Sequence, residues 1–249
     1  MTDRPVNALL DLAGETILVT GASGNIGRGI ARRLAEAGAG IVVHYFRDEA
    51  AARELVAELD CALVQADLGD EAAVEAMLAQ CRPTMVVNNA AAQPVQALPE
   101  MSFPDWRGVM SANLDGPFLV TQRAAAAWGD AGGAIVNIAS IEGMDPAVGH
   151  AHYASSKAGL LMFSRAAALE YGARGIRINC VSPGLIERNG LADDWPDGVA
   201  RWQERAPLTG IGTPNDVADA VLFLLSPAAR WISGANLVVD GGMSAQSRW

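Results

Sequence analysis

The sequence predicts an α/β fold: a single doubly wound parallel sheet of about seven strands, with helices on both faces. Three observations support it. Short runs rich in Val and Ile alternate with amphipathic helical runs along the chain. A glycine-rich turn follows the first of these runs and is itself followed by a helical pattern. Polar residues recur where the apolar runs end, as expected at the carboxyl edge of a parallel sheet.

The composition fits one globular domain, so we expect residues 1–249 to form a single unit. Hydrophobic residues are 51% of the chain, and the formal net charge of -10 argues against nucleic acid and anionic membranes as partners. The sequence shows no signal peptide or membrane-spanning run, and Cys61, Cys81 and Cys180 are scattered, as in a reducing compartment. We therefore expect a cytoplasmic protein without a metal site.

In the first half of the chain, strands are expected over 15–20, 40–46, 61–65 and 84–88, and helices over 28–37, 48–59 and 70–80. The glycine-rich turn Gly21-Ala-Ser-Gly-Asn-Ile-Gly27 lies between the first strand and the first helix. Glycines let a backbone approach a pyrophosphate closely, and the free amides of a helix N-terminus bind it. We therefore interpret this turn as a nucleotide-binding loop.

In the second half, helices are expected over 103–128, around Tyr153 and over 215–225, and strands over 134–139, 177–181 and 236–240. Residues 185–208 contain two tryptophans and two prolines without a clear periodicity. This composition predicts a mobile, irregular flap over a substrate site.

Tyr153 and Lys157 are four residues apart in a helical run, so their side chains share one helix face. A free phenol has a pKa of about 10, and a nearby cation favours its ionised form. Such a pair can transfer a proton. Taken alone, however, the spacing is common and also fits a solvated helix surface.

Several short motifs occur in a fixed order along the chain. They are Thr20-Gly-Ala-Ser-Gly-Asn-Ile-Gly27, Asp67-Leu68, Asn88-Asn-Ala-Ala91, Asn113, Ser140, Tyr153-x-x-x-Lys157, Pro183-Gly184 and Asp240-Gly-Gly242. With them the chain resembles the short-chain dehydrogenase/reductase family over nearly its whole length, in particular its 3-oxoacyl-reductase-like and pteridine-reductase-like members. The resemblance implies a Rossmann-type sheet, a nicotinamide dinucleotide, hydride transfer at an alcohol or carbonyl carbon, and a homotetramer or homodimer.

The resemblance also implies four catalytic residues. Tyr153 would be the general acid in ketone reduction, or the base in alcohol oxidation. Lys157 would lower the pKa of Tyr153 and hold the nicotinamide ribose, and Ser140 would hydrogen-bond the substrate oxygen. Asn113 would anchor a water that relays protons to Lys157. From its position alone, a solvated helix surface or a cap is the favoured reading for Asn113.

The implied cofactor contacts lie at or just after strand ends. They are Gly21, Ser23, Asn25, Ile26 and Gly27 at the pyrophosphate, Asp67 and Leu68 at the adenine, Asn89 and Ala90 at the adenine ribose, and Pro183, Gly184, Ile186, Tyr153 and Lys157 at the nicotinamide end. Asp67 could instead cap the helix that follows it.

Three positions depart from the family pattern. Asn25 replaces the second glycine of the turn, and asparagine tolerates a left-handed backbone better than most residues. Ala91 replaces a glycine, and Arg188 stands where a threonine is common. Our hypothesis is that Arg188 meets the pyrophosphate or an acidic substrate group, because a guanidinium favours oxyanions; the alternative is a solvated flap arginine.

The end of the second strand bears on the choice between the two nicotinamide cofactors. An acid there binds the ribose 2′-hydroxyl, whereas an arginine accommodates a 2′-phosphate. The chain reads His44-Tyr-Phe-Arg47, which resembles NADP-dependent members of the family. We predict NADPH rather than NAD, with Arg47 as the phosphate partner aided by His44, while Asp48 would cap the next helix.

The predicted function is that of an NADP(H)-dependent oxidoreductase, acting as a ketoreductase on a small carbonyl or alcohol substrate. The substrate pocket would be bounded by Ser140, residues 142–152, residues 93–98 and the flap. Four residues there could touch substrate, although each also has an ordinary structural explanation: Glu142, His150, Trp195 and Trp202. Alternatives are an NAD-dependent alcohol or sugar dehydrogenase and a catalytically silent dinucleotide sensor.

Overall fold

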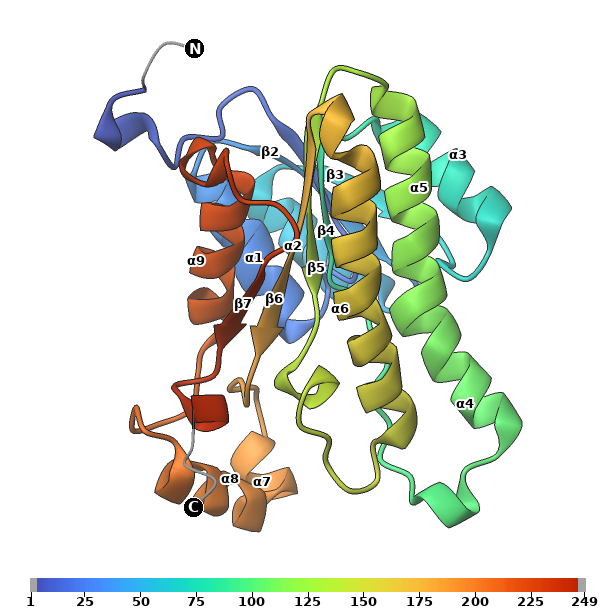
Figure 1. Ribbon diagram of the computed structural model, residues 1–249, viewed down its shortest axis with the longest axis vertical. Helices are drawn as coiled ribbons and strands as arrows, with labels where there is room; N and C mark the ends of the chain where they lie inside the picture. Colours follow the sequence, from blue (N-terminus) through green and yellow to red (C-terminus); the bar gives the residue numbers. More distant parts are fainter. Residues whose placement is uncertain (1–3, 246–249) are drawn as a thin grey trace.

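The computed structural model describes residues 4–245, and the seven strands in this range form one sheet (Figure 1). The strand order is β3-β2-β1-β4-β5-β6-β7, and every neighbouring pair is parallel. The order reverses direction between β1 and β4, which is where ligands bind in doubly wound sheets. The predicted fold class is confirmed.

The first half of the chain alternates strands and helices as expected. Its elements are β1 Thr16–Val19, α1 Asn25–Glu36, β2 Gly40–Tyr45, α2 Glu49–Leu59, β3 Ala62–Gln65, α3 Glu71–Cys81 and β4 Met85–Asn88. Helix α1 begins three residues earlier than the predicted position 28, at Asn25. The whole second part of the glycine-rich turn is therefore already helical.

The second half contains two departures from expectation. Its elements are α4 Phe103–Met110, a π-helical turn Ser111–Asp115, α5 Gly116–Trp128, β5 Gly133–Ile138, α6 Ala151–Tyr171, β6 Ile176–Pro183, α7 Leu191–Asp194, α8 Pro196–Arg205, α9 Pro214–Leu225 and β7 Asn236–Val239. The predicted helix over 103–128 is interrupted by the π-helical turn that carries Asn113. Such turns are rare and occur frequently at functional sites.

The second departure is the predicted flap over 185–208, which contains helices α7 and α8 rather than irregular chain. Its tryptophans pack locally: a Cβ added to Gly198 would lie 1.9 Å from the Trp195 ring, and one added to Gly184 would lie 2.6 Å from the Trp202 ring. The glycines thus make room for indole rings, a role that the irregular composition did not reveal. Figure 1 shows this segment beyond the carboxyl ends of β6 and β7.

The sheet is covered on both faces (Figure 1). Helices α1, α2 and α9 pack on one face with Ile17 and Val19, and helices α3, α5 and α6 pack on the other with Leu18. Alternate residues of one strand point to opposite faces, so each apolar strand feeds both cores. This leaves the strand ends for polar groups.

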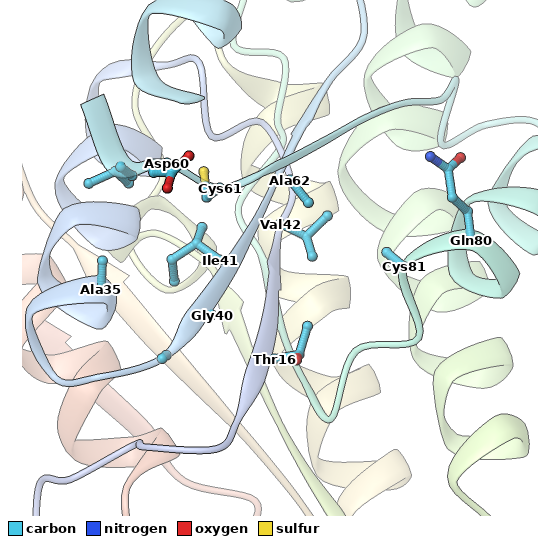
Figure 2. Close-up of a pocket in the computed structure, with 12 residues that line it drawn as sticks. Thr16, Ala35, Gly40, Ile41, Val42, Asp60, Cys61, Ala62, Gln80 and Cys81 are labelled. Carbon is cyan, nitrogen blue, oxygen red and sulfur yellow. The ribbon is translucent and has the colours of Figure 1, made fainter. Parts of the chain in front are cut away.

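A hollow opens at the amino-terminal edge of the sheet (Figure 2). It is formed by the starts of β1, β2 and β3 and the ends of α1 and α3, and Cys61 and Cys81 contribute to its lining. Within residues 4–245, no helix has the length and apolar character needed to cross a membrane. In the same range, no group of three or more His, Cys, Asp or Glu could hold a metal ion.

Candidate active site

The glycine-rich turn at the end of β1 packs against the chain that leaves β4. Gly21 has a φ of 61°, and a Cβ placed on it would lie 2.8 Å from the Ala90 Cα. A Cβ on Gly27 would lie 2.4 Å from the Gly21 carbonyl oxygen and 2.8 Å from the Asn89 Nδ2. Real Cβ atoms do not approach so closely, so these two positions require glycine, as the motif predicted.

The N-terminus of α1 is open. Its N-cap is Gly24, and no side chain caps it. Helices α2, α3, α4 and α9 are capped by the side chains of Asp48, Asp70, Ser102 and Thr213, whereas α5, α6, α7 and α8 lack a side-chain cap as α1 does; α1 alone among these uncapped helices follows a glycine-rich turn. Free amides at the positive end of a helix dipole bind phosphate groups. The residues of this turn therefore fit a dinucleotide pyrophosphate.

Asn25 does not use the left-handed conformation that we expected it to tolerate. It is the first residue of α1, and the positive-φ residues other than glycine in residues 4–245 are Asp60 and Arg82. Its side-chain amide donates to the Glu187 carbonyl oxygen at 2.6 Å. The asparagine thus ties the glycine-rich turn to the segment after β6, a contact that a glycine could not make.

Thr20 connects β1 to β4. Its Oγ1 accepts hydrogen bonds from the backbone amides of Asn89 at 2.9 Å and Ala90 at 3.0 Å. The Asn89 side-chain amide donates in return to the carbonyl oxygens of Thr20 and Gly21. Six hydrogen-bonding groups are therefore satisfied where the strand order reverses, and Asn89 and Ala90 are held beside the turn.

His44 braces the turn from the other side. Its Nδ1 accepts from the Gly21 amide at 3.1 Å, and its Nε2 lies 3.1 Å from the Ala66 carbonyl oxygen. Burial lowers the pKa of His44 from 6.5 to about 4, against the opposing effect of the Ala66 bond, so the ring is neutral. The expectation that His44 assists a phosphate is corrected, because Gly21 and Ala66 occupy both ring nitrogens and neither is free to donate to a phosphate.

Arg47 and Asp48 follow β2 and have separate roles. Asp48 Oδ1 accepts from the Ala51 amide at 3.0 Å, which makes it the N-cap of α2, as predicted. The exposed Arg47 guanidinium lies 4.8 Å from the Phe46 ring centroid. The Asp48 carboxylate therefore caps α2, while the Arg47 guanidinium, stacked on Phe46, places a positive charge at the end of β2.

Asp67 and Leu68 follow β3. Asp67 is exposed and accepts from the Gly69 amide at 2.9 Å, whereas Asp70 is the residue that caps α3. The alternative that Asp67 caps the helix is therefore excluded. Leu68 is 7% exposed and packs in the core beneath α3 and α5.

Tyr153 and Ser140 lie together beside the end of β5. Tyr153 is 7% exposed and hydrogen-bonds to the Ser140 side chain. Burial raises the pKa of Tyr153 to about 12; the Ser140 bond lowers it, and the Glu142 charge raises it further. Ser140 Oγ also accepts from the Glu142 amide at 3.1 Å, which fixes the hydroxyl at the strand end.

Lys157 is fully enclosed one turn further along α6. Its Nζ donates to the Ile138 carbonyl oxygen at 2.8 Å and lies 5.5 Å from the Tyr153 ring centroid. Burial lowers the pKa of Lys157 to about 8. The expected lowering of the Tyr153 pKa is not present in this structure, because removal of the phenol from water outweighs the other effects on it.

Asn113 is buried in the π-helical turn and clamps the chain after β4. Its Oδ1 accepts from the Ala92 amide at 2.7 Å, and its Nδ2 donates to the Ala92 carbonyl oxygen and the Ser156 Oγ. Ser156 in turn donates to the Tyr153 carbonyl oxygen at 2.7 Å. Asn113 is therefore neither a solvated surface residue nor a cap, but a buried link between Ala92 and the tyrosine helix.

The remaining predicted residues follow β6. Pro183 ends the strand, the Gly184 amide donates to the Val239 carbonyl oxygen at 2.9 Å, and Ile186 is 9% exposed. The Arg188 guanidinium forms a 2.6 Å ion pair with Asp194 in α7. In this structure, its charge is already matched within the segment.

Sequence reasoning missed three contributors. Thr20 was part of the quoted motif without a role, and Ser156 lies inside Tyr153-x-x-x-Lys157 without being counted. Gln93 donates from Nε2 to Glu142 Oε1 at 3.1 Å. A signal existed for Thr20 and Ser156, since both are hydroxyl residues within quoted motifs, and Gln93 lies in the 93–98 loop that was expected to border the substrate pocket, although its contact with Glu142 was not.

Known proteins share both this sequence and this fold. A family profile described as Enoyl-(Acyl carrier protein) reductase matches residues 21–244. The chain is 35% identical to 3beta-hydroxysteroid dehydrogenase 1 of Eggerthella lenta, over 94% of this chain and 95% of that protein. It is 37% identical to a 3-oxoacyl-(acyl-carrier-protein) reductase of Chlamydia muridarum, over 94% and 98%. This chain belongs to the short-chain dehydrogenase/reductase family.

A solved structure agrees with this membership. The blue fluorescent protein from a metagenomic library, in complex with NADPH, superposes with a TM-score of 0.87 at 34% identity, covering 94% of this chain and 99% of that chain. As a short-chain dehydrogenase/reductase, the protein is an NAD(P)-dependent oxidoreductase that acts on carbonyl or alcohol groups. The open α1 N-terminus and the two glycine positions supply the physical fit to that cofactor.

Proposed function

We propose that the protein is a ketoreductase that prefers NADPH. The observation that carries the proposal is the buried Tyr153 hydroxyl, which hydrogen-bonds to the Ser140 side chain at the end of β5. A protonated phenol beside Ser140 is prepared to donate to an oxygen that is gaining negative charge.

In the proposed reaction, a bound nicotinamide would supply the hydride for the carbonyl carbon. Ser140 orients the carbonyl oxygen, and Tyr153 transfers its proton to that oxygen as charge develops. The neighbouring Lys157 stabilises the phenolate that remains, since its cation faces the ring at 5.5 Å. Asn113, held in place by Ala92 and Ser156, would anchor a water that relays protons to Lys157.

The proposed cofactor contacts are those implied by sequence, except for His44. They are Gly21, Ser23, Asn25, Ile26 and Gly27 at the pyrophosphate, Arg47 at the 2′-phosphate, Asp67 and Leu68 at the adenine, Asn89 and Ala90 at the adenine ribose, and Pro183, Gly184, Ile186, Tyr153 and Lys157 at the nicotinamide end. Arg47 supports NADPH because it is exposed at the end of β2, where the adenine ribose binds in such sheets.

The preference for NADPH is tested with Arg47→Ala and its matched control Arg53→Ala. Both variants remove one exposed guanidinium near the start of α2, but Arg53 pairs with Glu49. Loss of a charge-assisted contact of about 1.5–3 kcal/mol predicts a 10- to 100-fold rise in the Michaelis constant for NADPH in Arg47→Ala. A much smaller change is expected for NADH and for Arg53→Ala.

A carbonyl panel followed by NADPH and NADH absorbance tests the activity itself. Faster turnover with NADH in the unmodified protein would establish the alternative of an NAD-dependent alcohol or sugar dehydrogenase. Tight NADPH binding without turnover of any carbonyl would establish a dinucleotide sensor. An equal effect of Arg47→Ala on both cofactors would contradict the phosphate contact.

Exposed apolar side chains support a homotetramer or homodimer as part of the proposal. Phe118 on α5 and Met162 and Leu169 on α6 are 41%, 60% and 85% exposed, and Leu237 and Val238 on the edge strand β7 are also exposed. An apolar edge strand invites pairing with another chain. The unpaired thiols of Cys61, Cys81 and Cys180 support the proposed cytoplasmic location.

A further inference from the structure

A half-buried pair of an acid and an imidazole lies in the loop between β5 and α6. Glu142 Oε2 and His150 Nδ1 are 2.8 Å apart, and the side chains are 16% and 15% exposed. Gln93 donates to the other carboxylate oxygen, Glu142 Oε1, at 3.1 Å. Both carboxylate oxygens are therefore satisfied, and the proposed catalytic roles use none of these three residues.

The pair lies next to the proposed proton donor. His150 precedes Tyr153 by three residues, and the two rings meet edge to face with centroids 6.0 Å apart. Glu142 follows Ser140 by two residues and donates its backbone amide to the serine Oγ. The pair thus borders both residues that would hold the substrate oxygen.

The imidazole leaves one nitrogen without a partner. His150 Nε2 is buried and forms no hydrogen bond. Because the carboxylate accepts from Nδ1–H, a neutral ring presents Nε2 as a hydrogen-bond acceptor. A buried polar atom without a partner costs roughly 1–3 kcal/mol, so a ligand that completes this bond gains affinity there.

A purely structural role explains the pair poorly. His150 occupies the N-cap position of α6, yet its side chain makes no cap hydrogen bond. The Glu142 charge also acts against ionisation of Tyr153, an effect that an apolar side chain would avoid. The presence of Glu142 is better explained by its contact with Nδ1, which fixes the orientation of the His150 ring.

We propose that His150 Nε2, oriented by Glu142 and Gln93, accepts a hydrogen bond from a second hydroxyl group of the substrate. The preferred substrate class is then a hydroxy ketone rather than the simple ketone of the same size. An anionic group is disfavoured, because it would lie beside the Glu142 carboxylate. This inference rests on the proposed ketoreductase function, since Tyr153 must hold the reacting oxygen.

The test compares matched pairs of hydroxy ketones and their deoxy counterparts over several chain lengths, with NADPH and the full-length protein. In the unmodified enzyme, kcat/KM should favour the hydroxy member of the best pair by about tenfold or more, equivalent to about 1.4 kcal/mol. Absence of that preference overturns the inference while the ketoreductase function stands. If no carbonyl is reduced at all, the proposed function itself fails.

Variants then locate the effect. In His150→Phe the selectivity ratio should fall to near one, and in Glu142→Ala it should fall partly, through a higher KM for the hydroxy ketone. Asp145→Asn, which removes a nearby exposed charge in the same loop, should retain the unmodified ratio. A folded His150→Phe protein that binds NADPH but loses kcat/KM equally for both members would show a structural role and overturn the inference.

Discussion

The two edges of the sheet are built differently. At the amino-terminal edge, the hollow of Figure 2 is lined largely by small and apolar side chains, together with Cys61 and Cys81. Burial raises the pKa of both thiols, for Cys81 to about 11, so they remain protonated and unreactive at neutral pH. At the carboxyl edge, burial instead lowers the pKa of Lys157 to about 8, close to physiological pH.

The difference shows that the hollow at the amino-terminal edge does not mark the position of the catalytic groups in this fold. The carboxyl edge gathers an uncapped helix N-terminus, a neutral buried His44 and the Tyr153–Ser140 pair. The amino edge offers space but no comparable set of donors and titratable groups among its lining residues. Four substitutions can break or sharpen this contrast.

The largest effect is expected for Tyr153→Phe, which removes the hydroxyl and keeps the ring. Because general acid catalysis contributes about 10²- to 10⁴-fold, kcat should fall by about 10³-fold. Steady-state kinetics with the best carbonyl substrate measures this change, with unfolding curves to confirm the fold. Cys81→Ala, in the amino-edge hollow, is the control and should leave kcat nearly unchanged. Similar losses in both variants would remove the functional distinction between the edges.

The next effect concerns stability and pH. His44 has a pKa of about 4 in the folded protein and 6.5 as the reference value, so the unfolded chain binds a proton first as the pH falls. Stability is therefore lost between about pH 6.5 and pH 4, by about 2 kcal/mol at pH 5 and about 3 kcal/mol in total. Urea unfolding at pH 7.5 and pH 5 measures the loss. His44→Gln should flatten that part of the curve, and an unchanged slope would contradict the buried neutral ring.

Much of the fold was predictable because its signals are local and repeated. Alternating strands and helices located all seven strands, and the predicted polar residues lie at or after the carboxyl ends of those strands. Tyr153 and Lys157 share one face of α6, because four-residue spacing on a helix has one geometric outcome, whereas Ser140 joins them from the end of β5.

What could not be predicted depends on contacts between distant segments. His44 forms its two hydrogen bonds with Gly21 and Ala66, which are distant in sequence. The run His44-Tyr-Phe-Arg47 therefore could not reveal that the ring supports the glycine-rich turn. The pKa of Tyr153 depends on burial, which spacing does not report. Residues 185–208 contain helices α7 and α8, and the contacts of their tryptophan rings with Gly184 and Gly198 cannot be inferred from composition.

A smaller effect is expected from a methyl group at the glycine-rich turn. Gly27→Ala places a Cβ 2.4 Å from the Gly21 carbonyl oxygen, whereas Gly40→Ala at the amino edge meets its nearest atom at 3.6 Å. Overpacking costs about 1–3 kcal/mol, so Gly27→Ala should lose stability and bind NADPH at least several-fold more weakly. Gly40→Ala should change neither quantity appreciably. NADPH fluorescence titration and thermal unfolding compare them, and equal behaviour would refute the close approach at Gly27.

The smallest effect is expected at Asn25, whose side chain joins the turn to the segment after β6. Because Asn25 and its partner Glu187 are both exposed, Asn25→Ala should lower the free energy of unfolding by less than about 1.5 kcal/mol. Amide exchange over 186–194 should accelerate by less than about tenfold, with faster NADPH release, because a bond that bridges two segments restrains both. Arg32→Ala removes the exposed Arg32–Glu58 pair two turns further along α1 and should leave that exchange unchanged. Identical exchange in both variants would mean that Asn25 replaces the family's glycine without restraining the segment that would cover the nicotinamide.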